Sequence, residues 1–478
     1  MDWQGGLAAA QRQTQAWQAE EGAPGGVILL FDRSDVRGTA CGGLADPAWC
    51  VPFTPETKTR YASISKQFLT SVLLALGTDL TAPLGFGVGD EVPVGRALDM
   101  TGGLPDVMET YWLLGVPPSA GLSRGALVDF VSRLRGLNFA PGTEISYSNT
   151  GYRLMQAKLA GAYEETLSQR FLRPLGLGIT LPEDTATIVP NLARGAIPVN
   201  GRWEYGRYGP HISASGGLAG SALDLARWGQ ALLRDEVPLA PLAARHHLAD
   251  GRATDYGLGL AHGPLGSVGH GGSLPGYKNH LVLLPEAGAG VVVLSNREST
   301  DPHAVALAVA GALLGAAAPA EGALPPTTPE GLFVADGEPL WLEVKDGGAF
   351  LQGAKAGAAH LPVALAASGD ALEGEIGLAR RRFTRARPLA APLVWEGRYS
   401  NRDLDAAFEV AVRDGKATLT RGTGPLRSVI ELQPLRPDLA LARQTEGAWT
   451  QGFAVAFEGG KARLVSNRSR VLSFNRRE

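Results

Sequence analysis

Apolar residues in the first two thirds of the chain form runs and longer segments that predict a mixed architecture of strands and helices. Residues 26–31 read Gly-Val-Ile-Leu-Leu-Phe between a Pro-Gly pair and an aspartate, which predicts a buried strand. Residues 66–76 are long and apolar enough for a buried helix that opens near Ser63. Further strands are predicted at 256–261, 280–284 and 290–294, followed by an alanine-rich helix at 303–314.

Strands therefore come from both ends of this first part, and helical, loop-rich sequence separates them. Such an order predicts an α/β domain that carries a helical insertion, rather than regular βαβ repeats. We assign this domain to residues 1–317.

The last third has a different pattern, in which short alternating runs are joined by tight turns. The runs 340–344, 408–412 and 453–457 are each followed by a glycine-containing turn, which predicts β-hairpins. The stretch 318–330 is rich in Ala, Pro and Thr and lacks apolar periodicity, so it is interpreted as a linker. We predict two small antiparallel β-barrel domains, at 331–388 and 394–478.

Composition and charge narrow the classes of function. The 478 residues are 45% hydrophobic and 19% charged, a globular composition, and the formal net charge is -3 without long runs of one sign. No nucleic acid or anionic membrane is expected as a partner. The chain lacks an apolar segment of the roughly 20 residues that a bilayer requires and starts without a basic leader, so we expect a soluble, cytoplasmic protein.

Cofactors and metal ions are not expected. Cys41 and Cys50 are too few for a disulfide framework or a structural zinc site. The adjacent His246 and His247 lack the three- or four-residue spacing of a helical metal motif. The expected partner is a small peptide, amide or ester substrate, and the sequence leaves open whether the chain forms a homodimer.

Ser63 and Lys66 are candidates for a nucleophile and its base. Acyl transfer needs a hydroxyl and a group that takes its proton, and residues three apart at a helix start share one face. Burial and the positive helix end both favour the neutral amine that a base must be. Among the eight lysines, only Lys66 has a serine three residues before it, so we favour catalysis over a solvated surface pair.

Tyr147 and Asn149 form a second candidate pair, two residues apart in the run Pro-Gly-Thr-Glu-Ile-Ser-Tyr-Ser-Asn. Tyrosine can relay a proton and asparagine can hold a substrate. The same spacing occurs at Tyr277-Lys278-Asn279 and at Tyr399-Ser400-Asn401, which we interpret as ordinary turns favoured by asparagine.

The third element is His270-Gly271-Gly272-Ser273, placed just ahead of a predicted strand. Its glycines would let the backbone of a substrate approach closely. Two other interpretations are a structural turn and the oxyanion loop of an α/β-hydrolase. The latter fold lacks its nucleophile here, because no Gly-x-Ser-x-Gly occurs.

The order Ser-x-x-Lys, Tyr-x-Asn, His-x-Gly resembles the penicillin-recognising serine hydrolases, in the branch of the class C β-lactamases. Phrases such as Gly102-Gly103-Leu104-Pro105 and Gly216-Gly217-Leu218 resemble this branch as well. Within it, the length and the β-rich tail are most similar to the D-stereospecific aminopeptidases. The resemblance implies a β-lactamase/transpeptidase-like α/β fold, in which an antiparallel sheet is flanked by helices and joined by a helical subdomain, followed by two small antiparallel β-barrels.

The resemblance also implies roles for the candidate residues. Ser63 would be acylated, Lys66 and Tyr147 would exchange protons with it, and Asn149 would orient the substrate amide. The backbone amides of Ser63 and Ser273 would form the oxyanion hole, beside Gly271 and Gly272. A neutral His270 stands where β-lactamases and carboxypeptidases usually carry a lysine, which favours an aminopeptidase, amidase or esterase over a β-lactamase.

In D-aminopeptidases a loop of the last barrel shapes the pocket for a free α-amine. The matching segment would start at Arg421-Gly422-Thr423-Gly424-Pro425, which carries no acid for an ammonium group. The leading hypothesis is a D-aminopeptidase that acts through a Ser63 acyl-enzyme. The alternatives are an esterase or a D-Ala-D-Ala carboxypeptidase, and, from another class, a non-hydrolytic sensor of cell-wall peptides or β-lactams.

Overall fold

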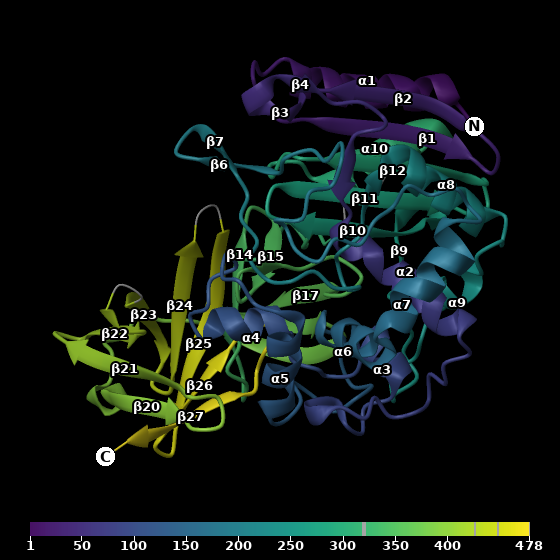
Figure 1. Cartoon of the computed structure of the whole chain (residues 1–478). Helices are drawn as coiled ribbons and strands as arrows, with labels where there is room; N and C mark the ends of the chain where they lie inside the picture. The colour runs from purple at the N-terminus through teal and green to yellow at the C-terminus, as the bar shows by residue number, and fades with distance from the viewer. Residues whose placement is uncertain (318–321, 425–426, 447–448, 478) are drawn as a thin grey trace.

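The structure is a computed structural model, and it describes residues 1–317, 322–424, 427–446 and 449–477. Its first part is built on a six-stranded antiparallel sheet (Figure 1). In spatial order the strands are β2 (Val36–Gly42), β1 (Gly26–Asp32), β12 (Ala289–Ser295), β11 (Tyr277–Leu284), β10 (Val268–Leu274) and β9 (Ala261–His262). The strands predicted at 26–31, 280–284 and 290–294 are confirmed, and the sheet does draw on both ends of the first part.

The strand predicted at 256–261 is wrong over most of its length, because only Ala261 belongs to β9. Gly259 has a φ of +99°, a left-handed backbone conformation that interrupts an extended strand. A β-carbon at this glycine would lie 2.8 Å from the backbone nitrogen of Gln67. The segment therefore turns and packs against the helix that follows Ser63.

The two faces of the sheet are covered by different helices, as the alternation of β1 requires. Ile28 and Leu30 are buried in a core shared with α1 (Trp3–Gln18) and α10 (Pro302–Leu314). Val27, Leu29 and Phe31 belong to a second core that includes α2 (Ser65–Ala75) and α8 (Ala222–Leu233). Each buried aliphatic side chain contributes about 1.5–3 kcal/mol, so both layers hold the sheet firmly.

A helical region lies beside the sheet and carries the rest of the first part. Its helices are α3 (Val94–Leu98), α4 (Val107–Leu113), α5 (Arg124–Arg133), α6 (Thr150–Leu159), α7 (Gly161–Thr166) and α9 (Leu239–Ala243). A two-stranded pair, β5 (Lys58–Arg60) with β8 (Ala219–Ser221), leads the chain into the segment that carries Ser63. Among the described helices, none is long and apolar enough to cross a membrane.

Beyond residue 330 the described residues form β-strands, as predicted, apart from a 3-10 turn at Leu393–Trp395, and the strands make two units. The first is a seven-stranded antiparallel sheet, here called the middle sheet, with β16 and β17 at its edges. In chain order its strands are β13 (Gly331–Ala335), β14 (Trp341–Lys345), β15 (Gly348–Leu351), β16 (Ala354–Lys355), β17 (Val363–Ser368), β18 (Ala371–Ile376) and β19 (Ala379–Arg385).

The second unit is a closed eight-stranded barrel, here called the C-terminal barrel. Its strands are β20 (Gly397–Asn401), β21 (Ala406–Arg413), β22 (Lys416–Arg421), β23 (Ser428–Arg436), β24 (Leu439–Glu446), β25 (Trp449–Glu458), β26 (Lys461–Val465) and β27 (Leu472–Arg477). The hairpins predicted around 408–412 and 453–457 are β21–β22 and β25–β26.

Both β units are fastened to the same short segment of the helical region, residues 144–146. The amide of Ile145 donates to the carbonyl of Gly377 in the middle sheet, at 3.0 Å. The hydroxyl of Ser146 donates to the carbonyl of Asn467 in the C-terminal barrel, at 3.2 Å. Glu144 pairs with Arg381 of the middle sheet, at 2.9 Å, and with Arg470 of the barrel, at 3.0 Å. Residue 147 therefore follows a segment that is held from two sides.

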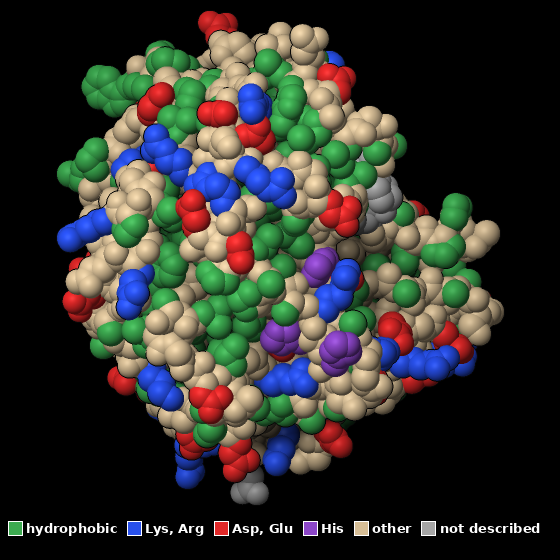
Figure 2. Space-filling model, turned by 90° about the vertical axis from the view of Figure 1, so that its right-hand side faces the viewer, with side chains coloured by type: hydrophobic (Ala, Val, Ile, Leu, Met, Phe, Trp, Pro, Cys, Tyr) green, Lys and Arg blue, Asp and Glu red, His purple; other side chains and the backbone are tan. Residues whose placement is uncertain are grey.

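The surface carries both signs of charge. Figure 2 shows acidic and basic side chains interspersed over one face, with apolar side chains scattered among them. This distribution agrees with the small net charge of -3.

Candidate active site

Ser63 lies in a 3-10 turn, Ala62–Ile64, directly before α2. Ala62 has a φ of 51°, in the left-handed region that a residue with a β-carbon adopts at a cost of about 1 kcal/mol or more. The turn leaves Ser63 partly exposed while both of its neighbours are buried. The hydroxyl is thus presented at the end of a rigid helix.

Lys66 lies one turn along α2 and is fully buried. Its Nζ is 3.1 Å from Ser63 Oγ, 2.8 Å from Asn149 Oδ1 and 2.6 Å from the carbonyl oxygen of Ser215. Burial is the main reason that the pKa of Lys66 is well below its ordinary value. A neutral amine in this position can accept the proton of Ser63.

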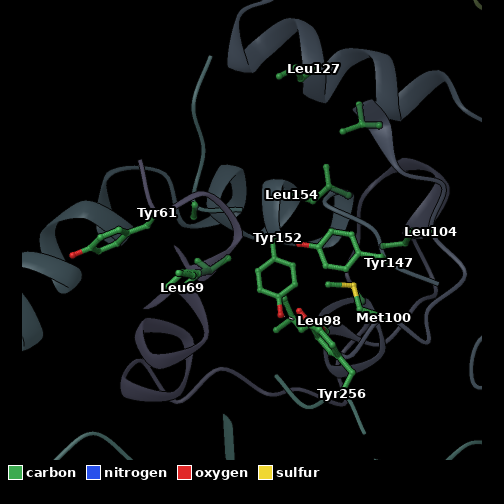
Figure 3. Close-up of a cluster of buried hydrophobic side chains, with 14 of the residues drawn as sticks. Tyr61, Leu69, Leu98, Met100, Leu104, Leu127, Tyr147, Tyr152, Leu154 and Tyr256 are labelled. Atoms are coloured by element: carbon green, nitrogen blue, oxygen red, sulfur yellow. Dashed lines mark hydrogen bonds between the residues drawn. The ribbon is translucent and has the colours of Figure 1, made fainter. Parts of the chain in front are cut away.

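Tyr147 also contacts Ser63. Its hydroxyl donates to Ser63 Oγ at 2.7 Å, and Lys66 Nζ lies 4.8 Å from the centre of its ring. Burial raises the pKa of Tyr147 well above its ordinary value, while the hydrogen bond with Ser63 and the charge of Arg468 lower it. Figure 3 shows the ring of Tyr147 next to Tyr152 and Tyr256, in a cluster of buried side chains.

Asn149 completes the group, and a residue that the sequence reasoning missed orients it. The buried Asp106 accepts hydrogen bonds through Oδ2 from the backbone N of Asn149, at 2.7 Å, and from its Nδ2, at 2.9 Å. The amide oxygen is thereby turned toward Lys66. Asp106 follows the Gly-Gly-Leu-Pro phrase at 102–105, but a single aspartate after a loop gives no signal of this role.

The structure brings Ser63, Lys66, Tyr147 and Asn149 together. The tyrosines of the two other Tyr-x-Asn sequences bind backbone carbonyls in other parts of the molecule. Tyr277 donates to the carbonyl of Ala193, at 2.7 Å, and Tyr399 to that of Trp395, at 2.9 Å. Neither contact involves Ser63.

His270 lies inside β10, not ahead of a strand, and it is buried. Its Nδ1 is 2.5 Å from the carbonyl oxygen of Gly271 and its Nε2 is 2.8 Å from the hydroxyl of Tyr256. A carbonyl only accepts, so Nδ1 carries the proton and Nε2 accepts from Tyr256. Burial, followed by the charge of Lys66, lowers the pKa of His270 to about 3, which agrees with the expected neutral imidazole.

The glycines after His270 allow β10 to pack against the turn that carries Ser63. A β-carbon on Gly272 would lie only 2.0 Å from the carbonyl oxygen of Tyr61. One on Gly271 would lie 3.1 Å from the ring of His280. Ser273 follows, and its Oγ accepts a hydrogen bond from Lys278 at 2.8 Å.

A pocket of about 230 Å³ opens over Ser63. Asn149 and Ser273 belong to its wall, which is otherwise largely apolar and contains no aspartate or glutamate among the described residues. The lining residues are Ala62, Ser63, Met108, Trp112, Pro118, Asn149, Arg153, Tyr208, Ile212, Ser213, Ser215, Gly216, Ser273, Leu274, Pro275 and Trp449.

The barrel reaches this pocket through a different hairpin from the one expected. Trp449, at the start of β25, belongs to the pocket wall, whereas no described residue of 421–428 does. Arg421 is buried instead, donates to the carbonyl of Leu113 and to Gln444, and has a pKa lowered by burial to about 10. Gly422, Thr423 and Gly424 are exposed, and Pro425 lies outside the described residues.

Two further groups of the β units contact Tyr147, and local sequence gave no sign of either. The guanidinium of Arg468, in the turn between β26 and β27, lies over the ring of Tyr147. The ring of His360, in the connection between β16 and β17, lies 4.9 Å from that of Tyr147. Arg468 also pairs with Glu109 at 3.7 Å, and its carbonyl accepts from the amide of Asp106 at 2.8 Å.

The chain matches a known protein family and curated relatives. The family described as Beta-lactamase matches residues 9–316. The chain is 27% identical to a D-aminopeptidase of Cereibacter sphaeroides, over 91% of this chain and 92% of that protein. It is 28% identical to a D-aminopeptidase of Brucella anthropi, over 53% of this chain and 52% of that protein.

Several solved structures have a fold similar to that of this chain. An octameric penicillin-binding protein homologue from Pyrococcus abyssi superimposes with a TM-score of 0.57 at 21% identity, covering 99% of this chain and 100% of that one. A D-amino acid amidase from Ochrobactrum anthropi superimposes with a TM-score of 0.53 at 20% identity, covering 66% of this chain and 99% of that one.

Proposed function

The chain belongs to the beta-lactamase family, and we propose that it is a serine hydrolase that releases N-terminal D-amino acids from small peptides or amides through an acyl-enzyme on Ser63. One observation carries the proposal. Ser63 Oγ lies within hydrogen-bond distance of both a depressed-pKa lysine, at 3.1 Å, and a buried tyrosine, at 2.7 Å. A solvated surface serine has no such pair of proton-transfer groups.

Acylation follows from this arrangement. The neutral amine of Lys66 takes the proton of Ser63 while Oγ forms a bond to the carbonyl carbon of the substrate. The backbone N–H groups of Ser63 and Ser273 would stabilise the oxyanion, since both residues line the pocket. When the C–N bond breaks, the leaving amine takes a proton that Tyr147 passes on from Lys66.

Deacylation runs through the same groups in reverse. A water molecule gives its proton to the base formed by Lys66 and Tyr147, and its oxygen attacks the ester carbonyl. The ester bond breaks, Ser63 regains its proton, and the free D-amino acid leaves. Asn149, held by Asp106, keeps Lys66 in line with Ser63 during both halves.

Relatives named D-aminopeptidase support the proposed substrate class. The substrate of such an enzyme carries an α-ammonium group, which needs an acceptor in the protein. The β24–β25 hairpin that supplies Trp449 also carries Glu446, which is the register partner of Trp449. Glu446 Oε1 accepts from Ser119 at 2.8 Å, whereas its buried Oε2 has no partner among the described residues. We assign the ammonium contact to this carboxylate.

The proposal is tested with purified wild-type protein and the variant Ser63→Ala on D- and L-amino acid anilides, short esters and D-Ala-D-Ala peptides. We expect D-anilides to be cleaved faster than L-anilides, and Ser63→Ala to lose both turnover and labelling by an active-site serine reagent. Retained turnover in Ser63→Ala would refute the mechanism. Rapid acylation without turnover would instead favour the sensor hypothesis.

A further inference from the structure

We propose that Arg153 forms an anion subsite in the catalytic pocket, so that the preferred substrates carry a carboxylate. This inference rests on the proposed function and names the substrate class within it. The carboxylate belongs either to the leaving group, as in a free dipeptide, or to the side chain of the released residue.

Arg153 is a buried cation without a counter-charge. It lies on α6, one turn after Asn149, and its side chain lines the same pocket as Ser63. Only 8% of its surface is exposed, and none of the ion pairs between described residues includes it. Buried charges are costly unless they are paired, so an unpaired arginine in a pocket indicates that a partner arrives with the ligand.

The hydrogen bonds of Arg153 leave donors unused. Nη1 donates to the carbonyl oxygen of His211 at 3.4 Å and Nη2 to the hydroxyl of Tyr208 at 3.2 Å, both long for a charged donor. Nε is buried and has no partner among the described residues. A guanidinium presents five N–H groups in a planar fork, which matches the two oxygens of a carboxylate.

A second, independent donor lines the same pocket. Trp112, on α4, has a buried Nε1 that lacks an acceptor among the described residues. An indole N–H only donates, so it needs an acceptor from the ligand too. Two donors without acceptors in one pocket wall favour an anionic oxygen group as the ligand at this subsite.

The charge of Arg153 also bears on the base. It is one of the causes that lower the pKa of Lys66, after burial. A bound carboxylate would therefore partly cancel the effect of Arg153 and raise the pKa of Lys66. For this reason the test compares substrates within each variant, because a general effect on Lys66 cancels in that ratio.

The test uses two substrate pairs and three variants. The pair D-Ala-D-Ala and D-Ala-D-Ala amide differs by a carboxylate in the leaving group, and the pair D-Glu amide and D-Gln amide differs by one in the side chain. The variants are Arg153→Met, which keeps length without charge, Arg153→Lys, which keeps the charge, and Lys158→Met. The last removes an exposed cation from the same helix and serves as the matched control.

We expect wild type and Lys158→Met to favour the carboxylate member of one pair by about tenfold or more in kcat/KM, as a charge-assisted contact provides. Arg153→Met should lose this preference, and Arg153→Lys should keep part of it, which separates the charge from a folding defect. The pair that responds identifies the source of the carboxylate. Turnover without a carboxylate preference in either pair would overturn the subsite, whereas no turnover on any of the four substrates would overturn the proposed function.

Discussion

The guanidinium of Arg468 lies 4.8 Å from the centre of the Tyr147 ring, although one belongs to the C-terminal barrel and the other to the helical region. The ring face of tyrosine attracts a cation, and a positive charge stabilises a tyrosinate. The barrel therefore supplies an electrostatic neighbour to the proton-transfer group, in addition to a wall of the pocket.

The variant Arg468→Met is expected to slow acylation about tenfold. Arg468 lowers the pKa of both Tyr147 and Lys66, so its loss raises both pKa values and moves the rising limb of the kcat/KM profile to higher pH. Stopped-flow acylation across the pH range measures both effects. Lys66, Tyr256, His270, His360 and the charge of Asp106 also act on Tyr147, and they are unchanged in this variant.

Arg470→Met is the control for this prediction. Arg470 lies in the same turn and pairs with Glu144, and its guanidinium lies over Phe139 rather than over Tyr147. We expect its pH profile to match that of wild type. An equal pH shift in both variants would assign the effect to docking of the turn and not to the charge on Tyr147.

The variant Lys66→Met should lose about 10³-fold or more in kcat, because it lacks the base. Its stability relative to wild type should depend on pH. The depressed pKa means that the folded wild type binds fewer protons at Lys66 than the unfolded chain, so the stability of wild type rises with pH up to about 10.4. Denaturant titrations should therefore show the variant gaining on wild type as the pH falls from about 10 to 7. A pH-independent difference would contradict a neutral Lys66.

Two histidines whose pKa values are lowered in the folded protein should make the protein sensitive to acid. The pKa values of His270 and His360 are both lowered to about 3 by burial, against about 6.5 in the unfolded chain. Their contribution to stability is complete above about pH 6.5 and is lost as the pH falls toward 3. In ¹H–¹⁵N spectra, His270 should keep its proton on Nδ1 from pH 5 to 8. An imidazole of His270 that titrates in this interval would refute the assignment.

Gly272→Ala should impair catalysis without a change in any polar group. The new β-carbon would meet the carbonyl of Tyr61, so the turn that carries Ser63 has to shift. A displacement of about 1 Å at a nucleophile costs on the order of 10²-fold in rate. Gly161→Ala, where a β-carbon meets no atom within 4 Å, is the control and should keep full activity. Equal rates for both variants would show that the close approach of β10 is dispensable.

Glu446→Gln tests the ammonium contact. It should raise KM about tenfold for the p-nitrophenyl ester of D-alanine, which loses a charge-assisted partner. The propionate ester has the same carbon skeleton without the amine, so its KM should stay constant. Equal changes for both esters would remove Glu446 from substrate recognition.

The pattern of apolar and polar residues predicted those elements that depend on residues close together in the sequence. The strand at 26–31 and the helix after Ser63 follow from runs of apolar side chains, and the Ser63–Lys66 contact follows from helical spacing. The strand predicted at 256–261 was wrong because Gly257 and Gly259 let the backbone pack closely against residues 242 and 67. The composition of the segment does not reveal these contacts.

Contacts between distant segments were beyond such reasoning. Asp106, His360 and Arg468 act on Tyr147 or Asn149 from three separate regions, and each looks like an ordinary loop residue in the sequence. The hairpin that reaches the pocket was likewise misplaced. Its identity depends on how the barrel is oriented on α4, which the alternation of strands does not determine.

Residues 144–146 are held by the middle sheet and by the barrel, and this has a consequence for the timing of activity. During synthesis the six-stranded sheet, Ser63 and Lys66 all emerge before residues 466–470. A nascent chain therefore carries its nucleophile well before Tyr147 acquires its last neighbours. Because Arg468 acts on Tyr147, we expect the full rate of acylation only after the C-terminal barrel has folded.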